Sequence, residues 1–208
     1  RAPTQMQLSV LRTLQGKPRA SILGCAGAGK SLLAIEKARR LAADGFDTVL
    51  ACFNQPLARA FARSPELQPH IESGRLVVGT FHDTDLPGAL ERALPTLGGR
   101  VQALVVDEGQ DFDELWLMLL EQLLVDPKRG VLYVFHDPAQ AIYRPDAVAT
   151  LGLEEYPLPD NCRNARPIHD LAYRFYDGTL PAEAIREDGR EPLSVEAEGL
   201  VATVDAVR

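Results

Sequence analysis

Leu23-Gly24-Cys25-Ala26-Gly27-Ala28-Gly29-Lys30-Ser31 is the stretch of sequence that decides the fold. The apolar segment 20–23 before it has the composition of a buried strand. In 32–41, after it, apolar residues recur at the three- and four-residue spacing of a helix face. Gly24 and Gly29 frame the spacing G-x-x-x-x-G-K-S of a phosphate-binding loop. The order of strand, glycine-rich loop and helix therefore predicts an α/β domain with an anion site.

The residue types in this loop fit the chemistry of a polyphosphate. Glycines let the backbone curl until several N–H groups point at one anion, and the following helix adds the positive end of its dipole. Lys30 is expected to reach the β- and γ-phosphates, and Ser31 to hold a magnesium ion. A glycine-rich turn that binds nothing is the alternative, but the full spacing and both flanking elements favour the phosphate site.

The composition is that of a globular protein with a net negative charge. Of 208 residues, 46% are hydrophobic and 25% charged, which suits one large domain or one domain plus part of another. The net charge of −7 argues against a surface that holds nucleic acid by bulk electrostatics, although a local basic groove stays open. Three cysteines without metal-ligand spacing, and no secretory signal or membrane-length apolar segment, lead us to expect a cytoplasmic protein.

Strands and helices alternate along the rest of the chain. The further predicted strands are the apolar segments 48–53, 76–78, 101–106 and 131–135. This alternation predicts a mainly parallel sheet with helices on both faces and with ligands at the carboxyl ends of the strands. Five residues lie at the carboxyl ends of two of these strands, where they could contact a ligand: Phe53, Asn54, Thr80, Phe81 and His82. Phe53 and Phe81 could equally cap the core.

Two adjacent carboxylates follow another predicted strand. One can bind magnesium while the other polarises water, so we assign Asp107 to the metal and Glu108 to the general base. An acidic residue after a strand can also merely cap the next helix. That alternative fits Asp111 or Asp113 better than it fits Asp107.

Three further side chains offer contacts to a nucleotide or a base. Gln140 lies just past a strand, where its amide could sense a γ-phosphate or orient attacking water. Gln7 lies on a predicted helix upstream of the loop and carries the donor and acceptor that an adenine edge requires, although either glutamine of that helix could simply be solvated. Tyr143 could stack on a base or pack in the core.

Together these segments resemble superfamily 1 DNA helicases of the UvrD/Rep type. Within that family, the runs at 53–57 and 107–112 are most similar to the bacterial branch that is sometimes joined to a nuclease-related domain. The motifs that carry the resemblance occur in the family's order over about 160 residues. They are 24–31, 53–54, 80–82, 107–111, 137–143 and 158–164.

The resemblance implies a RecA-like P-loop NTPase domain that uses ATP and Mg²⁺ to translocate along single-stranded DNA. It implies that Gln7 reads adenine, that Gln140 senses the γ-phosphate and that Arg163 is an arginine finger. The loop residues that it implies in nucleotide binding are Gly24, Ala26, Gly27, Ala28, Gly29, Lys30, Ser31 and Leu32. The residues that it implies in DNA binding are Phe53, Asn54, Thr80, Phe81, His82 and Tyr143.

The chain departs from the family pattern in three places. Cys162 stands where the family usually has a tyrosine that stacks on adenine, a contact of about 1–3 kcal/mol that bears on adenine selectivity or nucleotide affinity. Residues 144–146 replace a tryptophan that wedges between DNA bases. The interval 82–101 is too short for the accessory subdomain of such helicases, which this branch lacks or the chain has lost.

The end of the chain determines the expected domain organisation. We expect 1–178 to form the first RecA-like motor domain, and 179–208 to be a linker followed by the beginning of an incomplete second one. Motors of this type close two domains around the nucleotide. We therefore expect the chain alone to bind ATP weakly, to hydrolyse little and to unwind no DNA. A non-translocating P-loop ATPase switch and a catalytically silent DNA- or protein-binding module remain alternatives.

Overall fold

The computed structural model of this chain describes residues 5–80, 99–140, 147–174 and 182–192. The first half of the described chain contains α1 (Gln5–Thr13), β1 (Arg19–Gly24), α2 (Lys30–Ala43), β2 (Thr48–Cys52), α3 (Gln55–Ala62), α4 (Gln68–Glu72) and β3 (Leu76–Thr80). The second half contains β4 (Ala103–Asp107), η2 (Gly109–Asp111), α6 (Glu114–Glu121), β5 (Val131–His136), η3 (Pro138–Gln140), η4 (Ala147–Leu151), β6 (Glu155–Leu158), β7 (Asp160–Ala165), α7 (Arg166–Tyr173) and β8 (Glu183–Arg186). The elements named η are 3₁₀ helices.

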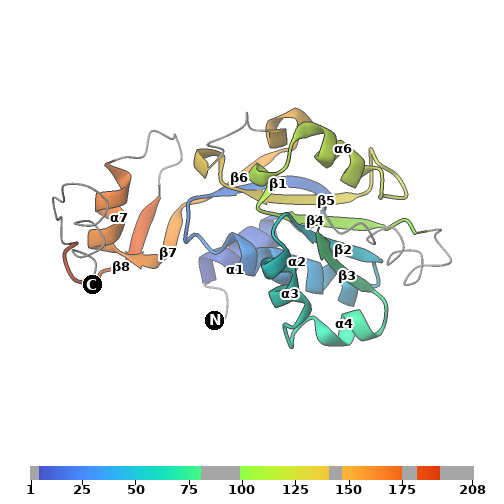
Figure 1. Cartoon of the computed structure of the whole chain (residues 1–208), viewed down its shortest axis with the longest axis horizontal. Helices are drawn as coiled ribbons and strands as arrows, with labels where there is room; N and C mark the ends of the chain where they lie inside the picture. The colour runs from blue at the N-terminus through green and yellow to red at the C-terminus, as the bar shows by residue number, and fades with distance from the viewer. Residues whose placement is uncertain (1–4, 81–98, 141–146, 175–181, 193–208) are drawn as a thin grey trace, which may run out of the picture.

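Six strands form one sheet in the order β3-β2-β4-β5-β1-β6, and every neighbouring pair is parallel. Helices α1, α2, α3 and α4 lie on one face of this sheet, and α6 lies on the other (Figure 1). The predicted α/β class, with a mainly parallel sheet covered on both faces, is confirmed. Because the strands are parallel, all their carboxyl ends lie along the same edge of the sheet.

The core consists of two apolar layers, one on each face of the sheet. Ile22 and Phe135 belong to the layer beneath α2, whereas Leu104 and Val134 belong to the layer beneath α6. Phe135 and Val134 are neighbours in β5 yet lie in different layers, since successive strand residues point to opposite faces. Each such fully buried side chain stabilises the fold by about 1.5–3 kcal/mol relative to an exposed one. The two layers hold the strand ends in place.

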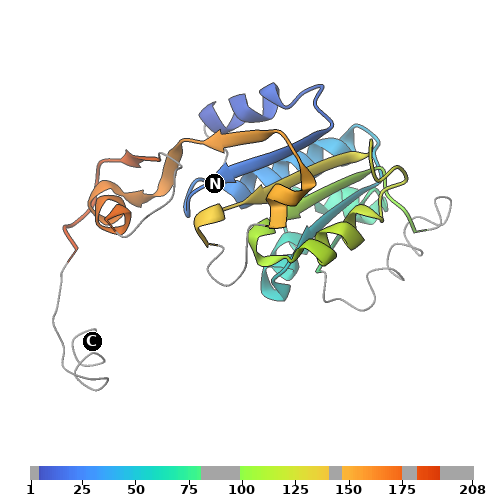
Figure 2. The ribbon, with the colours of Figure 1, turned by 90° about the horizontal axis from the view of Figure 1, so that it is seen from above.

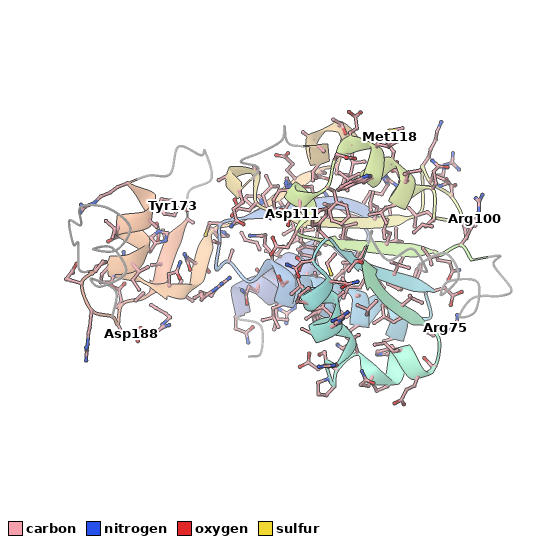
Figure 3. All side chains as sticks on the ribbon, viewed as in Figure 1. Arg75, Arg100, Asp111, Met118, Tyr173 and Asp188 are labelled. Atoms are coloured by element: carbon pink, nitrogen blue, oxygen red, sulfur yellow. The ribbon has the colours of Figure 1, made fainter. Side chains whose placement is uncertain are left out.

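Helix α6 buries only one of its faces. On the outer side of the helix, Leu115 is 61% exposed and Met118 51% exposed. Met118 lies at the outer boundary of the molecule (Figure 3). Leu117 and Leu120 on the opposite side of α6 are buried. No helix in the described ranges is long and apolar enough to cross a membrane.

The chain leaves the six-stranded sheet after β6. Strand β7 pairs with β8 in a separate parallel sheet of two strands, which α7 packs against. We call these three elements the arm, because they project beyond the sheet (Figure 2). The sequence analysis predicted no strand at β7, and it placed β8 inside a linker. The division at residue 178, which falls between α7 and β8, remains a proposal.

Candidate functional site

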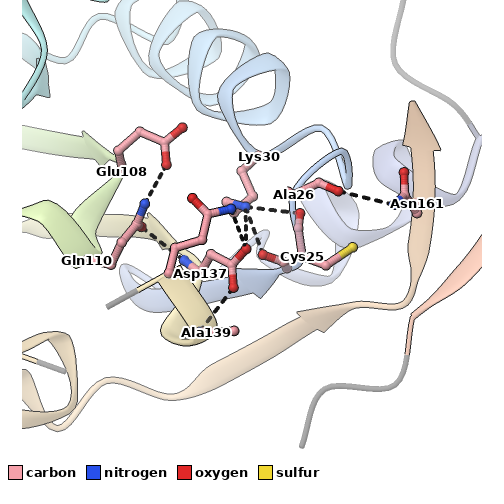
Figure 4. A network of polar contacts seen from close by, with 10 residues as sticks. Cys25, Ala26, Lys30, Glu108, Gln110, Asp137, Ala139 and Asn161 are labelled. Atoms are coloured by element: carbon pink, nitrogen blue, oxygen red, sulfur yellow. Dashed lines mark hydrogen bonds and ion pairs between the residues drawn. The ribbon is translucent and has the colours of Figure 1, made fainter. Parts of the chain in front are cut away.

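Three turns converge at the carboxyl edge of the six-stranded sheet. They follow β1, β4 and β5, and β5 lies between the other two strands. The turn after β1 is the glycine-rich loop that the sequence analysis predicts to bind phosphate, and the turn after β4 carries the expected pair of carboxylates. Figure 4 shows side chains from all three turns pointing toward one another. The topology therefore brings together residues that are up to about a hundred positions apart in the chain.

The loop depends on glycine at two positions. Gly27 has φ 94° and Gly29 has φ 89°, values that side-chain-bearing residues rarely adopt. A Cβ at Gly27 would lie 2.5 Å from the Asn161 Oδ1 atom, and a Cβ at Gly29 would collide with the Gln7 amide. The left-handed glycines give the loop its curl, and neighbouring segments pack directly against it.

Three successive carbonyl groups of the loop accept hydrogen bonds from residues outside the loop. The Asn161 Nδ2 atom donates to the Ala26 oxygen at 3.1 Å, and the Gln7 Nε2 atom donates to the Ala28 oxygen at 2.7 Å. Between them, the Cys162 backbone N–H donates to the Gly27 oxygen at 3.0 Å. The N–H and C=O of a planar trans peptide point in opposite directions. Outward-held carbonyls at Ala26 and Ala28 thus turn the N–H groups of Gly27 and Gly29 inward, as a bound anion requires, while the Ala28 N–H donates to the Cys25 carbonyl at 3.1 Å.

Lys30 lies at the start of α2 and is buried. Its Nζ atom donates to the Gly24 oxygen at 2.8 Å and to the Cys25 oxygen at 3.1 Å, and it lies 3.7 Å from the Asp137 Oδ2 atom. The ammonium group is thus held at the mouth of the loop by two carbonyls and one carboxylate. The structure places the predicted phosphate-contacting lysine beside the other two turns.

Asp107 is fully buried at the end of β4. Burial raises the pKa of its carboxyl group to about 7, and the charge of Glu108 adds to the rise. The Ser31 hydroxyl and the Lys30 ammonium oppose this rise. Neither carboxylate oxygen has a hydrogen-bond partner among the described residues. A buried, unpaired carboxylate that faces a serine hydroxyl has the donor chemistry of a Mg²⁺ site completed by phosphate and water.

No cluster of three or more histidine, cysteine, aspartate or glutamate side chains within the described ranges could hold a metal ion by itself. Mg²⁺ commonly uses one or two protein ligands and takes the rest from water and substrate phosphates. The Asp107 and Ser31 pair fits that pattern, and so the residues present fit the expected metal.

Glu108 has φ 55° and ψ 47°, the left-handed region. It is the only non-glycine residue with positive φ in the described part of the chain. Such a conformation costs on the order of 1–3 kcal/mol and commonly marks a functional turn. The next residue must be small, because a Cβ at Gly109 would lie 2.6 Å from the Val134 Cγ1 atom. The strained turn directs the Glu108 side chain toward the loop side of the edge (Figure 4).

Gln110 connects the second and third turns. Its Oε1 atom accepts from the Asp137 backbone N–H at 3.0 Å, which leaves its Nε2 atom to donate to Glu108 Oε2 at 2.7 Å. Asp137 in turn accepts from the Gln140 amide at 2.9 Å and from the Ala139 N–H at 3.2 Å. Burial raises the pKa of Asp137, while Lys30 lowers it. The predicted base, lysine and γ-phosphate sensor therefore belong to one polar network.

Replacing Gln110 by leucine should destabilise the protein. The substitution leaves a buried N–H of Asp137 and the Glu108 carboxylate without this partner, and an unsatisfied buried polar group costs about 1–3 kcal/mol. The free energy of unfolding, measured by urea titration, should fall by that amount. The matched change Gln122→Leu, at an exposed position, should shift it by less than about 0.5 kcal/mol. Equal effects would show that Gln110 makes no special contribution.

The predicted DNA-contacting residues have structural roles where the structure describes them. Phe53 stacks on Trp116 with ring centroids 5.6 Å apart and meets Phe112 edge-on. Asn54 caps helix α3, its Oδ1 atom accepting from the Leu57 N–H at 3.3 Å. Thr80 is buried, with no hydrogen bond at its Oγ1 atom among the described residues. Phe81, His82 and Tyr143 lie outside the described residues.

The remaining predicted residues lie beside the loop. Arg163 is exposed, and its Cβ would lie 3.1 Å from a Cβ at Gly27. Gln7 is buried, and its Nε2 atom also lies 3.4 Å from the Cys162 Sγ atom. The two residues expected on the adenine side, one matching the family and one departing from it, are therefore in contact.

The sequence analysis assigned no role to Gln110, Asp137 or Asn161, although all three lie in segments that carry the family resemblance. Their position inside a motif next to an assigned residue is the signal that could have singled them out. The Asn161 Nδ2 atom lies 3.2 Å from the His169 Nδ1 atom. No pattern in the sequence predicts this contact. That contact arises only from the packing of α7 against β7.

Comparison with known proteins leaves the family of this chain open. No protein-family model matches the chain, and no curated protein matches it. One similar solved structure is that of Bacteroides Pif1 bound to single-stranded DNA, at 17% sequence identity and a TM-score of 0.37. The match covers 84% of this chain, which spans 37% of the Pif1 chain. A likeness at this level assigns no function to the chain.

Proposed function

We propose that this chain is the first RecA-like motor domain of a superfamily 1 DNA helicase or translocase of the UvrD/Rep type, which hydrolyses ATP while moving along single-stranded DNA. The observation that carries the proposal is the meeting of Lys30, Ser31 and the unpaired Asp107 carboxylate at one edge of the sheet. The order of motifs in the sequence supports the helicase part of the proposal.

Each residue of the site has a proposed part in ATP hydrolysis. The curled loop binds the phosphates through inward N–H groups, and Lys30 exchanges its present carbonyl partners for phosphate oxygens. Asp107 and Ser31 hold Mg²⁺, which when bound neutralises charge on the phosphate oxygens. Glu108 takes a proton from the attacking water. Gln140, at the end of the polar network, senses the γ-phosphate.

Other parts of the proposal concern segments around the site. Gln7, whose amide donates to the Ala28 carbonyl and lies against Cys162 beside the loop, reads adenine. Arg163 supplies positive charge from the arm side, as an arginine finger would. A second RecA-like domain forms the other wall of the nucleotide site, and residues 1–178 form the wall described above.

A second candidate is an ATPase switch that does not translocate. The observation that favours it is that two predicted DNA-contacting side chains contact other parts of the protein. Phe53 packs against two aromatic rings, and Asn54 caps α3. If these side chains stay in their present places, fewer described groups remain to bind DNA. The two candidates differ in whether DNA accelerates ATP hydrolysis.

The test is ATP hydrolysis by a protein that contains both motor domains, with and without single-stranded DNA. A translocase should hydrolyse ATP faster with single-stranded DNA than without it, because DNA binding and nucleotide hydrolysis are then coupled. The Lys30→Ala variant, assayed in parallel, reports any contaminating ATPase. Hydrolysis without stimulation would favour the switch, and no hydrolysis or nucleotide binding would contradict both candidates.

A further inference from the structure

The arm is connected to the phosphate-binding loop by a chain of hydrogen bonds that are buried or partly buried. The chain begins at the Ala182 carbonyl beside β8, passes through His169 of α7 and Asn161 of β7, and ends at the Ala26 carbonyl of the loop. Asn161 is 2% exposed and His169 is 5% exposed. Figure 4 shows the Asn161 side chain on β7 directed at Ala26.

The Asn161 amide is fixed in one orientation. Its Oδ1 atom accepts from the backbone N–H groups of Arg163 and Asn164 at 3.2 Å and 3.0 Å. Its Nδ2 atom therefore faces the Ala26 oxygen and the His169 ring. A flipped amide would place oxygen against oxygen at Ala26 and would leave two N–H groups without an acceptor.

The His169 ring is fixed in one tautomer. Its Nε2 atom lies 3.0 Å from the Ala182 carbonyl oxygen, which can only accept, so Nε2 carries the proton. Its Nδ1 atom then accepts from Asn161 Nδ2 at 3.2 Å. Tyr173 packs against the ring with centroids 4.1 Å apart, which holds the imidazole in its plane. Both ring nitrogens are thus used to connect β7 with the segment before β8.

Strand β7 packs directly against the loop. A Cβ at Gly27 would lie 2.5 Å from the Asn161 Oδ1 atom, and the Cys162 N–H donates to the Gly27 carbonyl. A movement of β7 must therefore displace the Ala26 and Gly27 peptides or break their hydrogen bonds. Because Arg163 N–H is bound to the same Asn161 oxygen, such a movement displaces Arg163 as well.

From these contacts we infer that Asn161 and His169 are positioning residues, which couple the orientation of the arm to the shape of the phosphate-binding loop and so to nucleotide affinity. The inference rests on the proposed function, since it concerns the same nucleotide site. In this arrangement the arm is a regulatory element: a partner domain that moves it changes the Ala26 peptide, and a bound polyphosphate that fixes the loop restrains the arm in return.

The test uses this chain and a fluorescent ADP analogue with Mg²⁺. Asn161→Asp keeps the acceptor for Arg163 and Asn164 but places an oxygen against the Ala26 carbonyl, so the Kd should rise by about tenfold or more. His169→Leu removes both ring contacts and should also raise the Kd. The double variant should be no weaker than the weaker single variant, because both substitutions break the same chain of contacts.

Two further variants serve as controls. His169→Asn keeps an acceptor near the Asn161 amide and should recover part of the affinity that leucine loses. Glu187→Gln removes the ion pair with Arg166 on the exposed side of the arm, and it should leave the Kd unchanged. A thermal melt of each variant distinguishes a lost contact from a lost fold.

Hydrogen–deuterium exchange in the nucleotide-free chain gives an independent measurement. The loop segment 24–29 should exchange faster in Asn161→Asp and His169→Leu than in the wild type or in Glu187→Gln. Unchanged exchange, or a wild-type Kd in both single variants, would overturn the inference and leave the proposed function standing. A protein with both motor domains that binds no Mg²⁺-nucleotide would instead overturn the proposed function, while the exchange rates would still decide whether the arm holds the loop.

Discussion

Replacing Glu108 by glutamine is expected to lower ATP turnover by about 10²- to 10⁴-fold, the usual contribution of a general base. Glutamine has the same length but cannot take a proton from water. It keeps the amino-acid shape at the left-handed turn and leaves Lys30 and the loop in place, so nucleotide affinity should change little. Steady-state kcat and KM, measured in a protein with both motor domains and at saturating DNA, would separate the two effects.

Two further variants serve as a comparison and a control for this measurement. Lys30→Ala should weaken nucleotide binding as well as turnover, because it removes the ammonium group at the mouth of the loop. Glu114→Gln changes an exposed carboxylate of α6 and should leave kcat within about twofold of the wild type. If neither Glu108→Gln nor Lys30→Ala lowers the rate, the roles that we assign to these residues are wrong.

Replacing Asp107 by asparagine is expected to stabilise the metal-free protein above neutral pH. The wild-type carboxyl group has an ordinary pKa of 3.8 when exposed and a pKa of about 7 in the folded chain, because burial disfavours its charged form. The folded protein therefore holds a proton that the unfolded chain releases between these values. The free energy of unfolding should fall as pH rises through that window, by on the order of 1–4 kcal/mol.

Asparagine does not titrate, so the Asp107→Asn variant should lose this pH dependence and should unfold at higher urea concentration than the wild type at pH 8. Urea titrations at pH 4 and pH 8, with a chelator present, would measure the difference. Glu72→Gln, at an exposed position on α4, is the control and should leave the pH dependence as it is. A wild-type stability that rises between pH 4 and pH 7 through the Asp107 carboxyl would contradict the unpaired, buried site.

The parts of the structure that the sequence predicted correctly are those with strong local patterns. The phosphate-binding loop combines glycines at fixed spacing with an apolar strand before it and a helix after it. The strand that ends at Asp107 is uniformly apolar, as strands buried on both faces are. From these patterns alone, the parallel sheet and the meeting of Lys30 with Asp107 at its carboxyl edge could be expected.

The parts that the sequence did not reveal depend on contacts between distant residues. Strand β7 is mostly polar, and β8 lies in a segment marked by proline and glycine, so neither has the alternation of a strand. Both are extended because they pair with each other. Phe53 lies at the end of a strand, as is typical of a DNA-contacting residue, and this position led to its predicted role. Its packing on Trp116 depends instead on where α6 crosses the sheet.

The hydrogen bonds that hold the loop carbonyls also affect how the chain folds. The donors at Ala26 and Ala28 belong to segments 135 and 21 positions away in the chain, and Gln7 meets Cys162 across 155 positions. Contacts of such long sequence separation require large chain closures before they give any stabilisation. We therefore expect the glycine-rich segment to acquire its native shape late, after the amino-terminal helix and the crossing to the second sheet have docked. The phosphate affinity that we propose would in this sense report that the described segments have reached their native topology.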